Sequence, residues 1–419
     1  MDLSIVIPAW NEKENLLHLI PSVNETVGSL GLTHEVIVVN QPSGSTETIA
    51  ELEQIPCTRV LQQATSGYGS AILQGISAAK GDYIVTMDAD FSHNPSFLAD
   101  FWNARNSAEI VIGSRYVKDA RADMTLFRKF LSRVLNVMFG RGLSLPWKDL
   151  SSGFRLYKAS VVKSLKAVGH DFDVLQEILI RCYADGSKVS EIPIHYQARR
   201  SGSSHARLIK FGLSYMKTFY RMWKLRNSID SADYDDRAFD SIIPVQKYWQ
   251  RKRCDIIEKF TPTNTKTLDI GCGSTRMLGS EMKPWGLDIR LNKLRYARKF
   301  QRPLVNGSVF ALPFIDQSFD CVICSEVIEH IAGGDKPFTE MRRLLKPGGT
   351  LVIGTPDYAH RTWRWIEAIY GVVVPGGYAD EHITHYTYES LTSQLKSLGF
   401  EVKSAEYIMN SELILLCKL

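Results

Sequence analysis

No apolar run in this sequence is long enough to span a bilayer, and the first residues read as a strand instead of a basic region followed by an apolar signal core. We therefore expect any contact with a membrane to be peripheral. The formal net charge of +5 is small for 419 residues and does not indicate a nucleic-acid-binding surface. No nucleic-acid partner is expected.

Cysteine is sparse, and the seven cysteines are odd in number and scattered along the chain. This usage indicates reduced thiols and a cytoplasmic location. Cys321 and Cys324 form a C-x-x-C pair, but they lie in the apolar run 319–327 with no second pair nearby. The interior of a strand is therefore favoured over a zinc site.

The length of the chain predicts two domains, because 419 residues exceed what a single hydrophobic core usually supports. The composition, 44% hydrophobic and 23% charged, is that of an ordinary globular protein. Residues 228–240 are rich in Ser, Asp and Tyr, which indicates a linker. We expect a first domain over residues 1–227 and a second over residues 241–419.

Both halves alternate strand-like apolar runs with helix-like amphipathic segments, which predicts α/β domains built on parallel sheets covered by helices. The runs that read as strands are residues 3–7, 35–39, 267–270 and 285–289. The segments that read as helices include residues 69–79 and 248–260.

Two carboxylates, Asp88 and Asp90, follow an apolar run in the first half. A buried strand in this position delivers them to the carboxyl edge of the sheet, where open α/β folds bind ligands. Carboxylate oxygens suit Mg²⁺ or Mn²⁺, and such an ion can hold a diphosphate. Taken alone, an Asp-x-Asp pair is more often a solvated turn or a helix cap.

Five segments of the first half resemble family 2 glycosyltransferases, most closely the dolichol-phosphate-mannose-synthase branch. They are Ile5-Val6-Ile7-Pro8-Ala9-Trp10-Asn11-Glu12, Gly67-Tyr68-Gly69, Met87-Asp88-Ala89-Asp90-Phe91-Ser92-His93, Ile112-Gly113-Ser114-Arg115-Tyr116 and Ser151-Ser152-Gly153-Phe154-Arg155. The resemblance extends to about residue 227. It implies a GT-A fold and transfer of a sugar, with inversion, from a nucleotide sugar to a polyprenyl phosphate.

The resemblance also implies roles for individual residues. The donor-binding residues would be Pro8, Asn11, Glu12, Asn40, Gln41, Gly69 and Asp88, with Asn40 and Gln41 standing where the family has paired aspartates. The metal ligands would be Asp88 and Asp90, which together with Arg115 and Glu177 form the expected catalytic set. A polyprenyl phosphate is already anionic, so it needs a cationic cradle more than a base. The cradle would consist of Arg155, Arg199, Arg200 and His205.

Two other interpretations of the first domain stay open. A hydroxyl acceptor on a glycan would need a carboxylate base, which Asp171, Asp173 or Glu177 could supply. Alternatively, Asn40 and Gln41 mark a lost donor site, and the domain is a non-catalytic module that binds a lipid phosphate or a glycan. For any single arginine of the cradle, a surface ion pair is an equal alternative.

Two basic amphipathic segments, residues 126–143 and 207–226, carry many large apolar side chains. Such segments suit an anionic bilayer interface, and they predict peripheral association with the cytoplasmic face of a membrane. The alternative is an ordinary packed helix.

In the second half, a strand-like run leads into the glycines Gly271 and Gly273, and a second strand-like run ends in Asp288. The glycines allow a ligand to approach the backbone, and the carboxylate can accept hydrogen bonds from two ribose hydroxyls. The third glycine of the dinucleotide fingerprint is missing, which argues against NAD.

Further segments resemble class I S-adenosylmethionine-dependent methyltransferases, which have a Rossmann-like fold. They are Ala311-Leu312-Pro313-Phe314-Ile315-Asp316-Gln317-Ser318-Phe319-Asp320, Glu326-Val327-Ile328-Glu329-His330, Leu345-Lys346-Pro347-Gly348-Gly349 and Leu398-Gly399-Phe400. The resemblance implies that Asp269, Gly271 and Gly273 surround the methionine moiety of S-adenosyl-L-methionine and that Asp288 binds its ribose. Ser308 follows Gly307 where the family often has an aspartate for adenine.

Methyl transfer to oxygen needs an acceptor that loses its proton, and His330, His382 or His385 could act as the base. For His330, a structural role is an equal alternative. His382 and His385 could also be metal ligands, although the sequence identifies no partner for them. The chain is therefore expected to be a bifunctional enzyme that makes and methylates a membrane-anchored sugar or glycan precursor.

Overall fold

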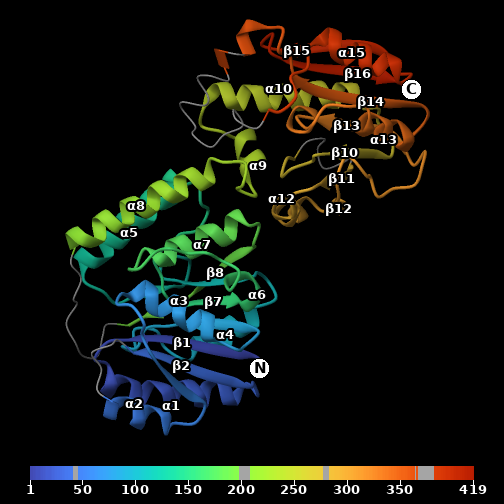
Figure 1. Ribbon diagram of the computed structural model, residues 1–419. Coiled ribbons are helices and arrows are strands. Elements are labelled where there is room, and N and C mark those ends of the chain that lie inside the picture. Colours follow the sequence, from blue (N-terminus) through green and yellow to red (C-terminus); the bar gives the residue numbers. More distant parts are fainter. Residues whose placement is uncertain (41–45, 198–207, 277–282, 364, 367–381) are drawn as a thin grey trace. The chain divides into compact units, whose positions relative to one another are not determined.

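The computed structural model describes residues 1–40, 46–197, 208–276, 283–363, 365–366 and 382–419 (Figure 1). The chain forms two compact units, Met1–Tyr183 with Ser187–Trp223 and Ala184–Gly186 with Lys224–Leu419. Each unit is an α/β sheet with helices on both faces, as the sequence predicts. Residues 228–240, expected to be a linker, belong to the second unit and contain helix α9 (Tyr234–Phe239).

The first unit contains a sheet with the strand order β3-β2-β1-β4-β7-β5-β8. Its strands are β1 (Leu3–Ala9), β2 (His34–Asn40), β3 (Thr58–Gln62), β4 (Tyr83–Thr86), β5 (Ile110–Ser114), β7 (Arg155–Lys158) and β8 (Val189–Pro193). Two short strands, β6 (Arg121–Ala122) and β9 (His195–Tyr196), pair separately. The helices are α1 (Lys13–Ser29), α2 (Thr46–Glu53), α3 (Tyr68–Ala78), α4 (Phe97–Ala104), α5 (Leu126–Gly142), α6 (Ala159–Val162), α7 (Val174–Ala184) and α8 (Leu208–Arg226).

Alternate residues of β1 point to opposite faces of this sheet, because side chains of a strand alternate. Ile5 and Ile7 pack in one core with the apolar residues of α1 and α4. On the other face, α3 approaches so closely that a Cβ on Gly75 would lie 2.2 Å from Val6 Cγ1. The sheet is not purely parallel, because β7 runs antiparallel to both β4 and β5.

The second unit contains a sheet with the order β12-β11-β10-β13-β14-β16-β15. Its strands are β10 (Thr267–Ile270), β11 (Trp285–Asp288), β12 (Leu304–Asn306), β13 (Phe319–Ser325), β14 (Leu345–Pro356), β15 (Glu401–Ile408) and β16 (Glu412–Lys418). The helices are α9, α10 (Pro244–Phe260), α12 (Leu291–Ala297), α13 (Lys336–Leu344) and α15 (Tyr388–Ser397), with the 3₁₀ turns η1 (Arg298–Phe300) and η2 (Ile328–His330). β16 is antiparallel to both of its neighbours.

The two faces of this second sheet bury separate sets of apolar residues. One core joins the strands to α13 and α15, and the other joins them to α10. Cys321 and Cys324 are both fully buried within β13, which confirms the expectation of a strand interior. None of the described helices combines the length and the hydropathy needed to cross a bilayer.

Candidate active sites

The first site lies at the carboxyl edge of the first sheet, where Asp88 and Asp90 follow β4. Tyr68, the first residue of α3, donates its hydroxyl hydrogen bond to Asp88 Oδ1 at 3.1 Å. The backbone N–H of Asp88 donates to Nδ1 of His93 at 3.0 Å. The Asp88 side chain is 29% exposed, so its carboxylate is accessible to a ligand.

Asp90 differs from Asp88 in its burial, since only 3% of it is exposed. Its Oδ1 accepts the backbone N–H of Ser92 at 3.1 Å and so holds the turn that follows the strand. The oxygens of Asp88 therefore fit an Mg²⁺ or Mn²⁺ ion better than those of Asp90. We assign Asp88 as the principal candidate ligand.

His93 is a residue of this site to which the sequence assigned no role. It is buried and stacks on Phe154 with a centroid distance of 4.8 Å. Burial lowers the pKa of His93, so the ring is neutral at pH 7. Because Nδ1 accepts the Asp88 amide, the proton lies on Nε2, 3.8 Å from Asp88 Oδ2.

Arg115 follows β5 and pairs with Asp149. Its Nε and Nη2 donate to the two Asp149 oxygens at 2.8 and 2.7 Å, and Nη2 also donates to Ser151 Oγ at 2.8 Å. Burial opposes charge on both groups, yet the pairing holds the pKa of Arg115 above its ordinary value and that of Asp149 below it. This arrangement neutralises the guanidinium and favours a positioning role over phosphate binding.

Arg155, expected to bind the acceptor phosphate, has a different position in the structure. It lies within β7 and is 0% exposed. Its Nη1 and Nη2 donate to the carbonyl oxygens of Leu175 and Leu150 at 2.5 and 2.7 Å. A guanidinium held in this way supports the loops around the site and cannot reach a ligand without breaking those bonds.

Two acidic residues, Glu177 of α7 and Asp173 just before it, also form hydrogen bonds. Glu177 is fully buried, and its oxygens accept hydrogen bonds from the Gly169 amide at 2.8 Å, Arg181 Nε at 2.8 Å and Arg221 Nη2 at 3.1 Å. Asp173 Oδ2 accepts the Thr218 hydroxyl at 2.6 Å. These contacts tie α7 to α8. Asp173 Oδ1 has no hydrogen-bond partner among the described residues, but both residues are buried, which makes either a poor general base.

The expected donor-binding residues are only partly assembled in the described structure. Asn40 ends β2 and is buried, and its Nδ2 has no hydrogen-bond partner among the described residues. Gly69 lies against the loop before α7: its N–H donates to His170 O at 2.8 Å, and a Cβ would lie 2.7 Å from the carbonyl oxygen of Asp171. Gly69 is therefore required for packing.

The other residues expected to bind the donor or the acceptor phosphate either precede α1 or lie outside the described part of the chain. Pro8 is in β1, Asn11 has a φ of 56°, and Glu12 Oε2 accepts the Asn15 amide at 2.6 Å. Four expected residues lie outside the described part of the chain, namely Gln41, Arg199, Arg200 and His205.

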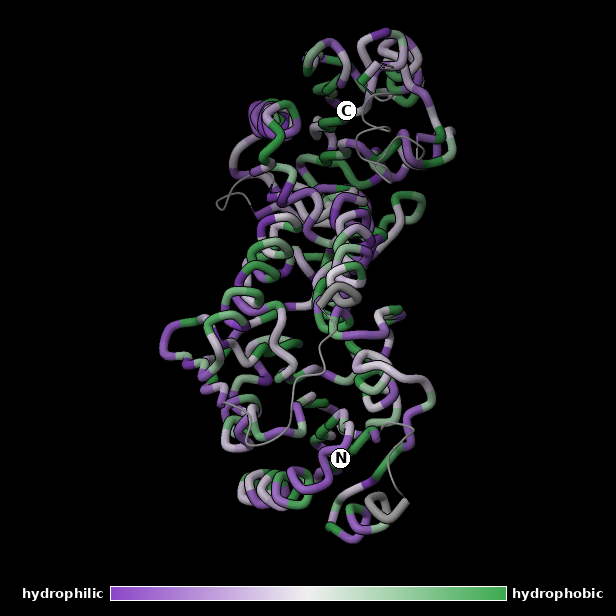
Figure 2. Tube along the Cα trace, turned by 90° about the vertical axis from the view of Figure 1, so that its left-hand side faces the viewer, coloured by the Kyte–Doolittle hydropathy of each residue, from purple (hydrophilic) through white to green (hydrophobic). Residues whose placement is uncertain are grey.

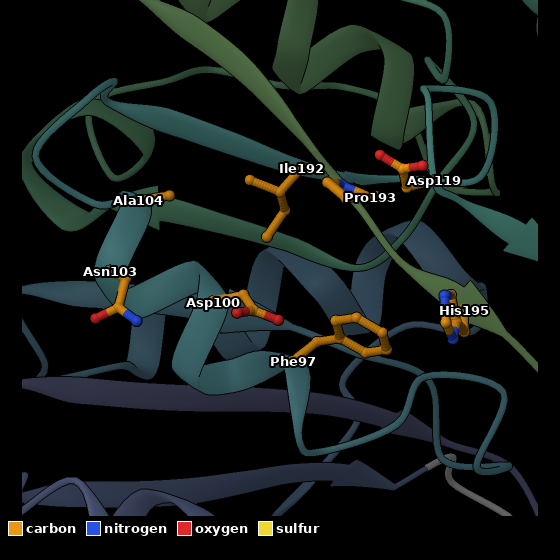
Figure 3. Close-up of a pocket in the computed structure, with 8 residues that line it drawn as sticks. All are labelled: Phe97, Asp100, Asn103, Ala104, Asp119, Ile192, Pro193 and His195. Atoms are coloured by element: carbon orange, nitrogen blue, oxygen red, sulfur yellow. The ribbon is translucent and has the colours of Figure 1, made fainter.

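A cavity of about 450 Å³ on the first unit contains none of the predicted catalytic residues. Phe97, Asp100 and Asn103 of α4 line one side of it, opposite Ile192 and the following residues (Figure 3). Its lining offers no cluster of groups suited to the predicted chemistry, so we do not assign it as the active site.

The second candidate site is the glycine turn after β10. Gly271 and Gly273 have φ values of 69° and 50°, and a Cβ on Gly271 would lie 2.1 Å from Val327 Cγ2. Asp288 ends β11 and accepts the backbone N–H groups of Gly273 and Arg290 at 2.8 and 2.7 Å. A carboxylate has about four acceptor positions, so both oxygens can still receive ribose hydroxyls. The turn therefore fits an adenosine-type cofactor.

Asp235 of α9 is a second residue that the sequence reasoning missed, because it lies in the supposed linker. Its Oδ2 accepts the Ser274 amide at 2.9 Å and Lys293 Nζ at 2.8 Å. A Cβ on Gly273 would lie 2.4 Å from the same oxygen. Burial opposes the charge, but Lys293 and Ser274 hold the pKa of Asp235 below its usual value. The segment that connects the two halves thus contacts the cofactor turn directly.

The remaining expected cofactor residues lie on the same edge of the sheet. Asp269, within β10, accepts a hydrogen bond from Arg302 at 3.2 Å, and burial raises the pKa of Asp269 to about 6. Ser308 follows β12, and its hydroxyl accepts the Phe310 amide at 3.3 Å.

His330 ends η2, immediately beyond β13, and the structure brings it close to His382. The two rings are 4.8 Å apart, and Tyr358 Oη lies 2.7 Å from His382 Nδ1. His385 instead stacks on Tyr358 at 4.0 Å. Glu326 has a φ of 58°, an unusual value for a non-glycine residue, and burial raises its pKa to about 8.

Comparison with known proteins agrees with this division. Residues 4–166 match the family described as glycosyl transferase family 2, and residues 268–353 match a methyltransferase domain family. The chain is 34% identical over 239 residues to a dolichol-phosphate mannosyltransferase from Pyrococcus furiosus, with 55% of this chain and 66% of that protein covered. It is 30% identical over 213 residues to an undecaprenyl-phosphate 4-deoxy-4-formamido-L-arabinose transferase from Edwardsiella ictaluri, with 50% and 64% covered.

The chain thus spans slightly less than two thirds of the length of these relatives. Among solved structures, a SAM-dependent methyltransferase from Thermotoga maritima matches with a TM-score of 0.37 and 20% identity. That match covers 44% of this chain and 93% of the other.

Proposed function

We propose that this chain, which joins a family 2 glycosyltransferase domain to a methyltransferase domain, is a bifunctional enzyme. The first domain transfers a sugar from a nucleotide sugar to a polyprenyl phosphate. The second uses S-adenosyl-L-methionine to methylate a hydroxyl of that sugar or of a lipid-linked glycan precursor. The proposal is carried by the position of Asp88 at the sheet edge, in a region 34% identical to a dolichol-phosphate mannosyltransferase.

In sugar transfer, Asp88 would hold the Mg²⁺ or Mn²⁺ ion, assisted by Asp90. When bound, such an ion would supply positive charge against the leaving nucleoside diphosphate. Tyr68 keeps the Asp88 carboxylate oriented: burial and Asp88 raise the pKa of Tyr68 well above its usual value, so its hydroxyl remains a donor. His93, neutral and stacked on Phe154, fixes the backbone at Asp88.

The lack of an available base on α7 favours a phosphate acceptor over a hydroxyl acceptor. Glu177 and Asp173 are both engaged in holding α8, so deprotonating a substrate would cost those contacts. If a glycan hydroxyl is the acceptor, Asp171 is the remaining candidate of the three. A phosphate acceptor needs only alignment and a cationic environment.

In methyl transfer, Gly271 and Gly273 admit the cofactor to the backbone, and Asp288 holds its ribose. The cofactor supplies an electrophilic methyl group to the acceptor oxygen. His330 and His382 lie beyond the neighbouring strand and are the groups that can assist loss of the acceptor proton. Covalent fusion raises the effective concentration of the first product near the second domain.

A single assay tests both activities. Purified full-length protein would be incubated with Mg²⁺ or Mn²⁺, a panel of nucleotide sugars and a short polyprenyl phosphate, with and without S-adenosyl-L-methionine. We expect a new glycolipid by mass spectrometry, and a mass increment of one methyl group only with the cofactor. Cofactor binding without sugar transfer from any donor would instead support a methyltransferase with a non-catalytic glycosyltransferase-like module.

Peripheral membrane association is proposed for the pair of helices α5 and α8, which lie side by side (Figure 1). They pack together through Phe139, which contacts Phe219 with a centroid distance of 5.4 Å. Both helices contain a mixture of hydrophobic and hydrophilic residues along their length (Figure 2). The exposed apolar residues are Leu126, Phe127, Phe130, Val134 and Val137 of α5 and Leu213, Met216 and Tyr220 of α8. Basic residues such as Arg133 lie among them and suit anionic headgroups.

Replacing both Phe127 and Phe130 by Ser is expected to weaken binding to anionic phospholipid vesicles by about tenfold or more. The two side chains are 60% and 62% exposed, and burying one phenylalanine is worth roughly 1.5–3 kcal/mol. Co-sedimentation with vesicles measures the effect. Val168→Ser, which removes an apolar side chain 52% exposed on the same unit, serves as the control. Equal binding of the double variant and the parent would exclude this surface.

A further inference from the structure

The second unit contains a cluster of metal-ligating side chains, Glu329, His330 and His382. One ligand atom from each residue lies within 4.8 Å of the ligand atoms of the other two. No other group of three or more His, Cys, Asp or Glu side chains in the described part of the chain meets this distance. The two histidines come from segments more than fifty residues apart in sequence, so the fold itself creates the cluster.

Backbone hydrogen bonds fix the relative position of the two segments. The carbonyl oxygen of Glu329 accepts the N–H groups of both Ile383 and Thr384, at 2.8 and 3.0 Å. The Thr384 hydroxyl donates in turn to the carbonyl oxygen of Ile331 at 2.6 Å. The residue after His382 is therefore hydrogen-bonded to the residue before His330, which holds the two imidazoles close together.

The Glu329 carboxylate is the observation that points to a ligand. It is 0% exposed, and its Oε2 accepts the Thr355 hydroxyl at 3.2 Å. Its Oε1 is buried and has no hydrogen-bond partner within the described chain. Leaving a buried polar atom without a hydrogen bond is costly, and a bound cation would remove that cost.

The charge around Glu329 also favours a cation. Glu326 and Glu412 are further carboxylates that interact electrostatically with Glu329. Arg253 forms ion pairs with both: its Nη2 lies 3.1 Å from Glu326 Oε2, and its Nε lies 2.6 Å from Glu412 Oε1. The Arg253 guanidinium thus serves Glu326 and Glu412, which leaves Glu329 as the acidic side chain that a cation would complement.

We propose that Glu329, His330 and His382 bind a divalent transition-metal ion beside the methyl-acceptor position. Two imidazoles and a carboxylate suit Mn²⁺, Fe²⁺ or Zn²⁺ and leave coordination positions open. Ligands at 2.0–2.2 Å from a metal are roughly 3–3.5 Å apart, so ligand atoms that are now up to 4.8 Å apart would approach by up to about 1.5 Å.

The contact between His382 and Tyr358 agrees with such a role. Metal-bound histidines usually donate their second ring N–H to an oxygen, which fixes the ring. Tyr358 Oη lies 2.7 Å from His382 Nδ1. When the ring proton is on Nδ1, this nitrogen donates to Tyr358 Oη, and the lone pair on Nε2 is available to a metal. Trp363 stacks on the same ring at 5.8 Å and an angle of 28°.

The position of the cluster gives the ion a function, a step that rests on the proposed methyl transfer. Val327, in the turn that leads to Glu329, touches the cofactor glycine Gly271. An ion here would bind the acceptor hydroxyl and lower its pKa, so the two histidines would assist proton loss as ligands of the ion and not as bases. The hydroxyl proton passes to solvent, the oxygen bonds to the methyl carbon, and the carbon–sulfur bond breaks with its electrons passing to sulfur.

Metal binding can be tested without cofactor or acceptor, so the result does not depend on the proposed reaction. Full-length protein carrying Asp88→Asn, which weakens the candidate ion site of the first unit, would be stripped with a chelator and titrated with Mn²⁺. Electron paramagnetic resonance would report free Mn²⁺. We expect one tightly bound ion, and at least tenfold weaker binding when His382→Ala or His330→Ala is added.

His360→Ala is the matched control. His360 is an exposed histidine of the same unit, 3.7 Å from Asp357, and its loss should change the Mn²⁺ dissociation constant by less than twofold. Thermal unfolding of each variant in chelator checks that it is folded. Dissociation constants within twofold of the parent in both folded cluster variants would overturn the proposal, as would the lack of any bound ion in the parent.

Discussion

Replacing Asp88 by Asn is expected to lower kcat for sugar transfer by about 10²- to 10³-fold, the cost of removing one group that stabilises charge in a transition state. The amide keeps the shape of the side chain and can still accept the Tyr68 hydroxyl at Oδ1. It loses the negative charge that would hold Mg²⁺ or Mn²⁺ against the leaving diphosphate. The loss should therefore appear in kcat and in metal affinity while the fold is retained.

The measurement is initial-rate formation of glycolipid at several Mn²⁺ concentrations. Asp82→Asn is the matched control, because Asp82 is an exposed carboxylate just before the same strand, at its other end. Its turnover should equal that of the parent. Near-normal turnover of Asp88→Asn would contradict the assignment of this residue and would leave Asp90 as the alternative ligand.

Hydrophobic patterning predicted the framework of both domains, because buried strands must be apolar whatever their context. The runs 3–7 and 35–39 appear as β1 and β2, and the helix expected over 248–260 appears within α10. The fold class and the position of Asp88 at the carboxyl edge followed from the same pattern. The ends of elements shifted by a few residues, as local signals rarely fix them.

The antiparallel pairing of β15 with β16 was missed because the turn before β16 carries no glycine signal. Met409 and Asn410 have φ values of 49° and 51°, which normally calls for Asn-Gly or Asp-Gly. Pairing between β15 and β16 holds the turn in this conformation. The sequence of the turn alone does not reveal the hairpin.

The roles of charged residues were harder to predict, because a motif does not show what a side chain pairs with. Arg155 belongs to a family-like segment, yet its guanidinium donates hydrogen bonds to two backbone carbonyl oxygens. Asp235 was hidden in a segment whose composition resembles a linker. The approach of His382 to His330 depends on backbone contacts between distant segments, which no local pattern records.

Replacing Asp288 by Ala is expected to weaken binding of S-adenosyl-L-methionine by about 100-fold. Two ribose hydroxyls would lose a charged acceptor, and hydrogen bonds to charged groups contribute about 1.5–3 kcal/mol each. The substitution also removes the carboxylate that receives the N–H of Gly273, so the cofactor turn becomes less ordered. Both effects act in the same direction.

Isothermal titration calorimetry of the full-length protein with S-adenosyl-L-methionine measures this change. Asp320→Ala removes a half-buried carboxylate at the second residue of β13, where it pairs with Lys346 at 2.7 Å, and should leave the dissociation constant unchanged. Sugar transfer by the Asp288 variant should also match the parent, because the first site does not contain this residue. An unchanged dissociation constant in Asp288→Ala would refute its ribose role and would shift attention to Asp235, the other carboxylate that contacts the same turn.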